Sequence, residues 1–203
     1  MDRIIPVVTL QNAEDRTKVL NALKKEGILC AEICFRTACA AEAIRLAVQE
    51  YPDMNIGAGT VINKAQCETA LDLGAKFIVS PGLSEEVALV CRERGVPYYP
   101  GCVTPTEITA AIDMGLDLIK FFPAGIYGGL AALKALSAPF GGVEFIPTGG
   151  VGQADLADYL RAPFVAAVGG SWLCTRRDIA GRDFEKIGTL CREAAETVRA
   201  VRG

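Results

Sequence analysis

Two charged residues interrupt apolar segments of this 203-residue chain. Lys120 lies within the run LIKFF at 118–122, and Glu32 lies within CAEIC at 30–34. An apolar surrounding disfavours the charged form of a lysine, which leaves neutral amine able to attack a ketone. Glu32 is a candidate for moving protons to and from the resulting Schiff base. The alternatives are a lysine that snorkels at a strand end and a structural ion pair of Glu32 with Arg36 or Lys120.

Polar and glycine residues at neighbouring strand ends predict a binding site for an anionic substrate. Arg36 shares the alternating face of Glu32, and its planar guanidinium can hold a carboxylate. The segment GAGT at 57–60 lets a ligand approach the backbone and offers the Thr60 hydroxyl. The glycine-rich turns PTGG at 147–150 and VGGS at 168–171 predict a phosphate site built from backbone N–H groups. Two tight turns without a ligand are the alternative.

Composition narrows the chemistry further. The chain has no histidine, so a Ser-His or Cys-His nucleophile pair and a histidine-ligated metal are excluded. None of the eight cysteines forms a CxxC pair, and we expect reduced, apolar fillers and no metal site. A net charge of −3 without a basic run argues against nucleic acid as a partner. There is no signal peptide pattern and no apolar run of about 20 residues, so we expect a cytoplasmic protein without a membrane partner.

The elements that position these residues alternate along the chain, and no linker divides it. Expected strands lie near 4–9, 30–35, 55–58, 76–80, 97–101, 118–122, 143–147 and 165–168. Expected helices cover 12–26, 40–50, 64–73, 84–94, 105–114, 129–136, 153–160 and 183–201. A doubly wound sheet would normally carry GxGxxG after its first strand, where this chain has TLQN. We therefore predict an α/β protein with one domain, residues 1–203, folded as a (β/α)8 TIM barrel.

Six motifs together resemble the 2-keto-3-deoxy-6-phosphogluconate (KDPG) and 4-hydroxy-2-oxoglutarate aldolase family. They are EICFRT at 32–37, GAGTV at 57–61, VSPG at 79–82, KFFPA at 120–124, PTGG at 147–150 and GGSW at 169–172. The sequence differs at Phe35 and Ala38, where the family often has leucine and proline. The resemblance implies a metal-free class I aldolase without a cofactor. It also implies a homotrimer that splits the phosphorylated sugar acid into pyruvate and glyceraldehyde 3-phosphate.

The resemblance also implies a role for each candidate residue. Lys120 forms the Schiff base, Glu32 is the general base and acid, and Phe122 packs beside the Schiff base. Arg36 and Thr60 hold the carboxylate of the pyruvate part, and Pro81 shapes the pocket near the ketone. The distal, phosphate end is lined by Thr148, Gly149, Gly150, Gly169, Gly170 and Ser171.

Other functions remain open at this point. Close alternatives are cleavage of 4-hydroxy-2-oxoglutarate to pyruvate and glyoxylate, and cleavage of the galactonate epimer of the main substrate. A phosphosugar isomerase or epimerase, and a non-catalytic metabolite-binding barrel, are alternatives of a different kind. Neither of these two explains a lysine inside a barrel strand.

Overall fold

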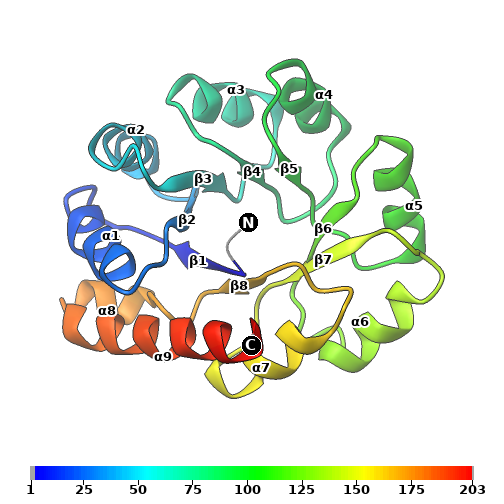
Figure 1. Ribbon diagram of the computed structural model, residues 1–203. Coiled ribbons are helices and arrows are strands. Elements are labelled where there is room, and N and C mark those ends of the chain that lie inside the picture. Colours follow the sequence, from blue (N-terminus) through cyan, green and yellow to red (C-terminus); the bar gives the residue numbers. More distant parts are fainter. Residues whose placement is uncertain (1–2, 203) are drawn as a thin grey trace.

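The computed structural model describes residues 3–202, and within them parallel strands form a barrel that helices surround (Figure 1). The strands are β1 Ile4–Val8, β2 Cys30–Cys34, β3 Asn55–Gly59, β4 Ile78–Val79, β5 Tyr98–Tyr99, β6 Leu118–Phe121, β7 Glu144–Pro147 and β8 Val168–Gly170. The helices are α1 Asp15–Lys25, α2 Ala40–Glu50, α3 Lys64–Asp72, α4 Glu85–Glu93, α5 Pro105–Asp113, α6 Gly129–Ser137, α7 Gln153–Arg161, α8 Arg176–Ala180 and α9 Phe184–Arg202. None of these helices is both long enough and apolar enough to cross a membrane.

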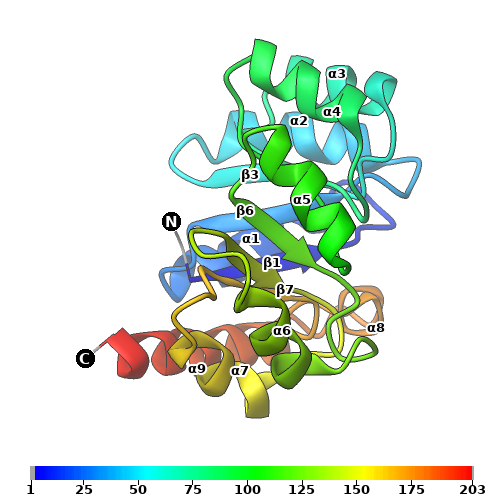
Figure 2. The same ribbon diagram turned by 90° about the vertical axis from the view of Figure 1, so that its right-hand side faces the viewer.

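The barrel consists of two pieces of sheet that join at two seams. Six strands pair in the order β5-β4-β3-β2-β1-β8, and β6 pairs separately with β7. A bridge between Gly101 and Lys120 connects the end of β5 to β6, and a bridge between Thr148 and Gly169 connects the end of β7 to β8. The ring is therefore closed, and Figure 2 shows the strands from the side between the helices. The predicted (β/α)8 barrel is confirmed.

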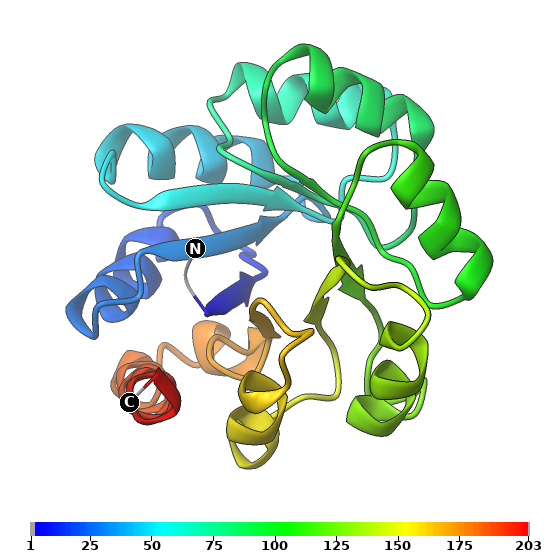
Figure 3. The same cartoon turned by 45° about the vertical axis from the view of Figure 1, so that its right-hand side comes forward.

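Figure 3 shows the strands inside the ring of helices from an oblique view. Alternation of side chains along each strand separates two apolar clusters, one on each face of the strands. On β6, Ile119 and Phe121 belong to the large core between strands and helices. Leu118, on the opposite face, packs against a smaller cluster inside the barrel, formed by Ile5, Cys30, Phe77, Val79, Ile146 and Ala167. Lys120 follows Leu118 on the inner face, so it lies toward the carboxyl ends of the strands, beyond this cluster.

Three helices begin at side-chain caps formed by residues close together in the sequence. The side chains of Asn63 and Ser84 accept hydrogen bonds from the N–H groups of Gln66 and Val87, and Thr104 forms a capping box with Glu107. Sequence patterns place these helix starts well because a cap is a contact between neighbours in the chain.

Several boundaries differ from the sequence prediction. Strand β8 covers Val168–Gly170 rather than 165–168, since its register with β1 begins at the pair Ile4 and Val168. Strands β4 and β5 are each shorter than expected; Pro97 and Pro100 flank β5 and cannot donate to a ladder. Helix α1 begins at Asp15 because Asn12 accepts from the N–H of Glu14 in a preceding turn.

The short helix α8 was not predicted at all. Thr175 caps it by accepting from the N–H of Asp178, and the pattern Thr-x-x-Asp was the sequence signal that could have revealed it.

Candidate active site

Lys120 and Glu32 face one another inside the barrel. Nζ of Lys120 on β6 lies 3.4 Å from Oε1 of Glu32 on β2, and both side chains are buried, with 7% and 3% of their surface exposed. An isolated buried charge is costly, and the two groups compensate one another. Both side chains therefore point into the same barrel, and they form the ion pair that the sequence offered as an alternative. The arrangement places a potential nucleophile within proton-transfer distance of a carboxylate.

An aromatic ring forms one wall beside the lysine. Nζ of Lys120 lies 5.1 Å from the ring centroid of Phe122, which directly follows β6 and is partly buried. On its far side this ring packs against the turn after β7, because a Cβ at Gly149 would lie 3.1 Å from a Phe122 ring carbon. Phe122 thus connects the lysine to the turn predicted to bind phosphate.

The side chain of Glu32 lies over the backbone of the neighbouring strand β3. In the register of β2 and β3, Glu32 pairs with Gly57, but its side chain extends to Gly59 two residues further on. A Cβ built on Gly59 would lie 2.0 Å from Oε1 of Glu32. The sequence pattern predicted that glycine here would admit a ligand; in the structure the carboxylate of Glu32 lies in that space.

Arg36 and Thr60 follow the ends of neighbouring strands β2 and β3. The loops that carry them are tied together, since the N–H of Phe35 donates to the carbonyl of Gly59 at 2.6 Å. The Arg36 guanidinium is exposed, and its Nη2 donates to Sγ of the buried Cys34 at 3.2 Å. Thr60 has φ of 58°, a strained value for a β-branched residue and one that is found at functional sites.

The predicted phosphate end combines residues from the ends of β7 and β8. Thr148 is buried and donates to the carbonyl of Ile146 at 3.3 Å, and it bridges to Gly169. A Cβ at Gly169 would lie 2.0 Å from Oγ1 of Thr148, so the two strands meet closely here. Gly150 and Ser171, at the outer ends of the two turns, are exposed, while Gly149 is partly buried and Gly170 is buried.

Pro81 lies in the turn after β4 and is exposed. Its carbonyl oxygen lies against the backbone of Gly101, where a Cβ would be only 2.0 Å away. Tyr98 supports the same turn by donating to the carbonyl of Gly82 at 3.3 Å. Burial raises the pKa of the Tyr98 phenol to about 12, so this side chain remains a neutral donor at neutral pH.

Two further titratable side chains around the barrel are held in the protonated form. Tyr99 packs against Phe77 inside the barrel with ring centroids 5.7 Å apart, and burial raises the pKa of its phenol. Burial likewise raises the pKa of the Cys102 thiol to about 12. These groups stay protonated at neutral pH, and the carboxylate in contact with Lys120 is that of Glu32.

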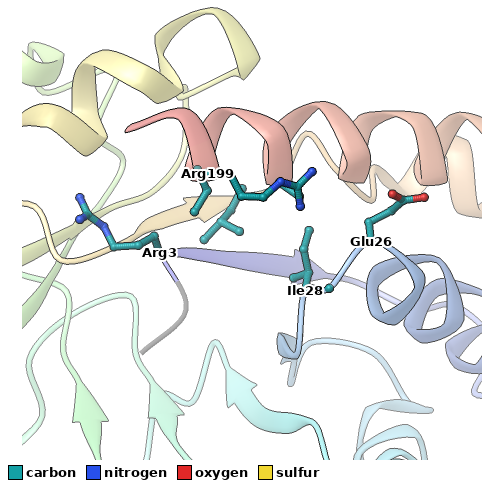
Figure 4. A pocket seen from close by; sticks show the side chains of 8 residues that line it. Arg3, Glu26, Ile28 and Arg199 are labelled. Carbon is teal, nitrogen blue, oxygen red and sulfur yellow. The ribbon is translucent and has the colours of Figure 1, made fainter. Parts of the chain in front are cut away.

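A separate pocket opens at the opposite end of the barrel (Figure 4). It lies between the start of β1, the segment before β2 and α9, and is lined by Arg3, Ile4, Glu26, Gly27, Ile28, Ala195, Val198 and Arg199. Glu26 is already paired with Arg192, and the Arg3 guanidinium donates to the carbonyl oxygens of Leu160 and Val165. Active sites of such barrels lie at the carboxyl ends of the strands. This pocket lies at the amino ends, so we do not assign it to the active site.

Residues 3–202 contain no group of three or more histidine, cysteine, aspartate or glutamate side chains close enough to hold a metal ion. The fold and the lysine–carboxylate pair together are typical of a barrel enzyme that attacks a carbonyl group with a lysine amine.

Comparison with known proteins identifies the family. The sequence model of the KDPG and KHG aldolase family matches residues 1–190 of this chain. The chain therefore belongs to this family. A 2-dehydro-3-deoxy-phosphogluconate aldolase of Treponema pallidum is 43% identical over 196 residues, which are 97% of this chain and 93% of that protein. A KHG/KDPG aldolase of Escherichia coli K12 is 39% identical over 193 residues, or 95% of this chain and 91% of the relative.

Solved structures agree with this assignment. A KDPG aldolase of Legionella pneumophila, with pyruvate captured as a covalent carbinolamine intermediate, superposes with a TM-score of 0.91. That enzyme is 36% identical, and the match covers 95% of this chain and 93% of the other.

Proposed function

We propose that this protein is a class I aldolase that cleaves 2-dehydro-3-deoxy-6-phosphogluconate to pyruvate and glyceraldehyde 3-phosphate. One observation carries the proposal: a buried lysine lies 3.4 Å from a buried carboxylate inside a closed barrel. Membership of the KDPG and KHG aldolase family supports this assignment. The carbinolamine captured in the Legionella enzyme supports Schiff-base chemistry and a mechanism that needs no cofactor.

The reaction begins at Lys120. Proton transfer from Nζ to Glu32 leaves a neutral amine, which adds to the C2 ketone of the substrate to form a carbinolamine. Glu32 returns this proton to the carbinolamine hydroxyl, which leaves as water, and an iminium ion forms while Glu32 becomes a carboxylate again. The positive nitrogen draws electrons from the C3–C4 bond, and this electron sink replaces the metal ion of other aldolases.

Glu32 performs the proton transfers that follow. As a base, directly or through a water molecule, it takes the proton of the C4 hydroxyl while the C3–C4 bond breaks, and the aldehyde product leaves. The enamine that remains on Lys120 takes a proton at C3, and hydrolysis of the imine releases pyruvate. Phe122 packs beside the reacting nitrogen and keeps that side of the lysine apolar.

The ends of the substrate are held at opposite sides of Lys120. Arg36 and Thr60, after β2 and β3, bind the carboxylate of the pyruvate part. Pro81 shapes the wall near the ketone. The phosphate binds at the ends of β7 and β8, where glycines allow it to approach the backbone N–H groups. The residues that line this end are Thr148, Gly149, Gly150, Gly169, Gly170 and Ser171.

A second substrate is 4-hydroxy-2-oxoglutarate, which the same steps would split into pyruvate and glyoxylate. The description of the matching family as KDPG and KHG aldolases favours it, as does the double name of the Escherichia coli relative. The two substrates share the pyruvate half and differ at the phosphate end. Assays with both, and with the C4 epimer of the first, establish which reaction has the highest kcat/KM.

We further propose that the chain acts as a single barrel domain, assembles as a homotrimer and works in the cytoplasm. Membership of the KDPG and KHG aldolase family supports these points. Light scattering after size-exclusion chromatography tests the trimer, and fractionation of cells tests the compartment.

The deciding experiment traps the Schiff base. The protein is incubated with pyruvate and borohydride, which reduces an imine to a stable secondary amine, and the modified peptide is mapped by mass spectrometry. We expect one adduct on Lys120, with no adduct in Lys120→Arg. A folded protein without any adduct would overturn the class I mechanism and favour an isomerase or a binding protein.

A further inference from the structure

Gly59 contacts the side chain of Glu32 rather than open space. The three heavy atoms nearest to a Cβ built on Gly59 all belong to Glu32: Oε1 at 2.0 Å, Cγ at 2.4 Å and Cδ at 2.5 Å. Native Cβ atoms do not approach neighbours this closely, so any side chain at position 59 would displace the carboxylate. Gly59 is the last residue of β3, and its φ is not in the left-handed region. Backbone conformation therefore does not require glycine here.

The strand register explains why this space matters. Glu32 pairs in register with Gly57, and Cys34 pairs with Gly59. The Glu32 side chain therefore runs along the barrel wall toward the carboxyl end, over the backbone of β3. Gly57 cannot carry a side chain either, because its Cβ would lie 2.3 Å from the ring of the buried Phe77. On the inner surface of β3, Gly57 thus leaves space for the ring of Phe77, and Gly59 leaves space for the carboxylate of Glu32.

The position that Gly59 allows is the one from which Glu32 reaches Lys120. The Glu32 side chain is only 3% exposed, and its Oε1 lies 3.4 Å from Nζ of Lys120. A methyl group at position 59 would push the carboxylate away from the wall of β3. Proton transfer depends on donor–acceptor distance, and a displacement of about 1 Å can lower the rate by about a hundredfold.

We propose that Gly59 is a positioning residue, whose missing side chain creates the space that holds the Glu32 carboxylate beside Lys120. The catalytic part of this inference rests on the proposed aldolase function. The steric part does not, and it can be measured without any substrate.

A double-mutant cycle tests the proposal. The variants are Gly59→Ala, Glu32→Ala and the double variant, and Glu32→Ala removes all three atoms that the new Cβ would meet. Gly59→Ala alone should lower Tm by roughly 5 °C or more, because a buried overlap must be relieved. In the Glu32→Ala background the same change should alter Tm by no more than roughly 1 °C. Gly188→Ala in α9, whose Cβ meets nothing within 4 Å, is the matched control and should not lower Tm.

Catalytic measurements on the same proteins separate positioning from general damage. Gly59→Ala should still give the reduced pyruvate adduct on Lys120, while exchange of the pyruvate methyl protons with deuterated water slows. The kcat for cleavage should fall by about a hundredfold with little change in KM, and it should not fall further when Gly59→Ala is added to Glu32→Ala.

Each outcome decides the inference. If Gly59→Ala lowers Tm equally in both backgrounds, or if neither variant that carries it folds, the glycine does not act through Glu32 and the proposal is wrong. If Gly59→Ala folds only together with Glu32→Ala, the proposal is supported. Loss of the pyruvate adduct in the wild type would overturn the aldolase function and leave the Tm cycle valid.

Discussion

Nζ of Lys120 lies 3.4 Å from Oε1 of Glu32, although 88 positions separate the two residues in the chain. The two side chains form an ion pair in a buried environment. A stable ion pair is not itself catalytic, because a protonated amine cannot attack a ketone. The short distance, however, lets the proton pass to the carboxylate when a substrate arrives. The pair therefore serves both as a buried ion pair and as a proton donor and acceptor, and substitutions can separate these two roles.

Replacement of Glu32 by glutamine should separate Schiff-base formation from bond cleavage. Glutamine keeps the volume and one acceptor but cannot take a proton, so kcat should fall by about a hundredfold to ten-thousandfold. Lys120 should still form the reduced pyruvate adduct, although more slowly, because its amine must then lose its proton to solvent rather than to a carboxylate. Steady-state assays and adduct mapping measure both quantities, with the exposed Glu42→Gln as control. Near-normal kcat in Glu32→Gln would mean that another group or a bound water does this work.

Replacement of Arg36 by lysine should weaken substrate binding more than it slows the reaction. Lysine keeps the charge but loses the planar pair of donors that suits a carboxylate. We expect KM to rise by about tenfold while kcat changes by less than about threefold. The rise should be equal for phosphorylated and unphosphorylated substrates, because both carry the same carboxylate. An unchanged KM would remove Arg36 from the binding site.

Replacement of Ser171 by alanine should affect only substrates that carry a phosphate. Ser171 is exposed at the end of β8, so loss of its hydroxyl should not disturb the core. One lost hydrogen bond to an anion should raise KM for the phosphorylated sugar acid roughly threefold to tenfold. KM for 4-hydroxy-2-oxoglutarate should stay constant. Equal effects on both substrates would place the phosphate elsewhere.

Asp178 should make stability depend on pH. The Lys186 ammonium at 2.6 Å and the Thr175 hydroxyl at 2.6 Å lower the pKa of this buried carboxyl below its usual 3.8. A carboxyl with a lowered pKa in the folded state stabilises the protein above the unfolded pKa. That contribution disappears as the pH falls through the folded pKa.

Asp178→Asn should therefore lower the free energy of unfolding by about 1–2 kcal/mol at pH 7. The difference from wild type should shrink below pH of about 4. Urea titrations at several pH values measure this, and Asp72→Asn, which breaks an exposed ion pair with Arg94, is the control with little expected effect. A difference that is constant down to acid pH would contradict the assigned cause.

The sequence predicted the class of fold and singled out Lys120 and Glu32 because both follow from local periodicity, but it offered their ion pair only as an alternative. Successive side chains of a strand point to opposite faces, so a charged residue points inward when the residues on either side of it point outward. Lys120 and Glu32 both follow this rule. Polar residues after strands must gather at one rim of a parallel barrel. No distance between strands was needed for either prediction.

Contacts that depend on register could not be predicted in this way. The role of Gly59 depends on which residue of β2 lies beside β3 and in which direction its side chain leans. The thiol of Cys34 as the partner of Arg36 depends on the turn of the backbone after β2. The limits of β4, β5 and β8 depend on how adjacent strands meet around the ring, and single-strand patterns do not contain this information.

The active site depends on both pieces of sheet that meet at the two seams of the barrel. Glu32 belongs to the six-stranded piece and Lys120 to the β6–β7 piece, and isolated bridges join the two. The nucleophile and its proton acceptor are therefore partners only while the ring is whole. A fragment that ends before β6 and its complement would each be inert, yet a mixture in which they reassociate should recover turnover. Catalysis would then report the assembly of two half-barrels, as a split reporter does.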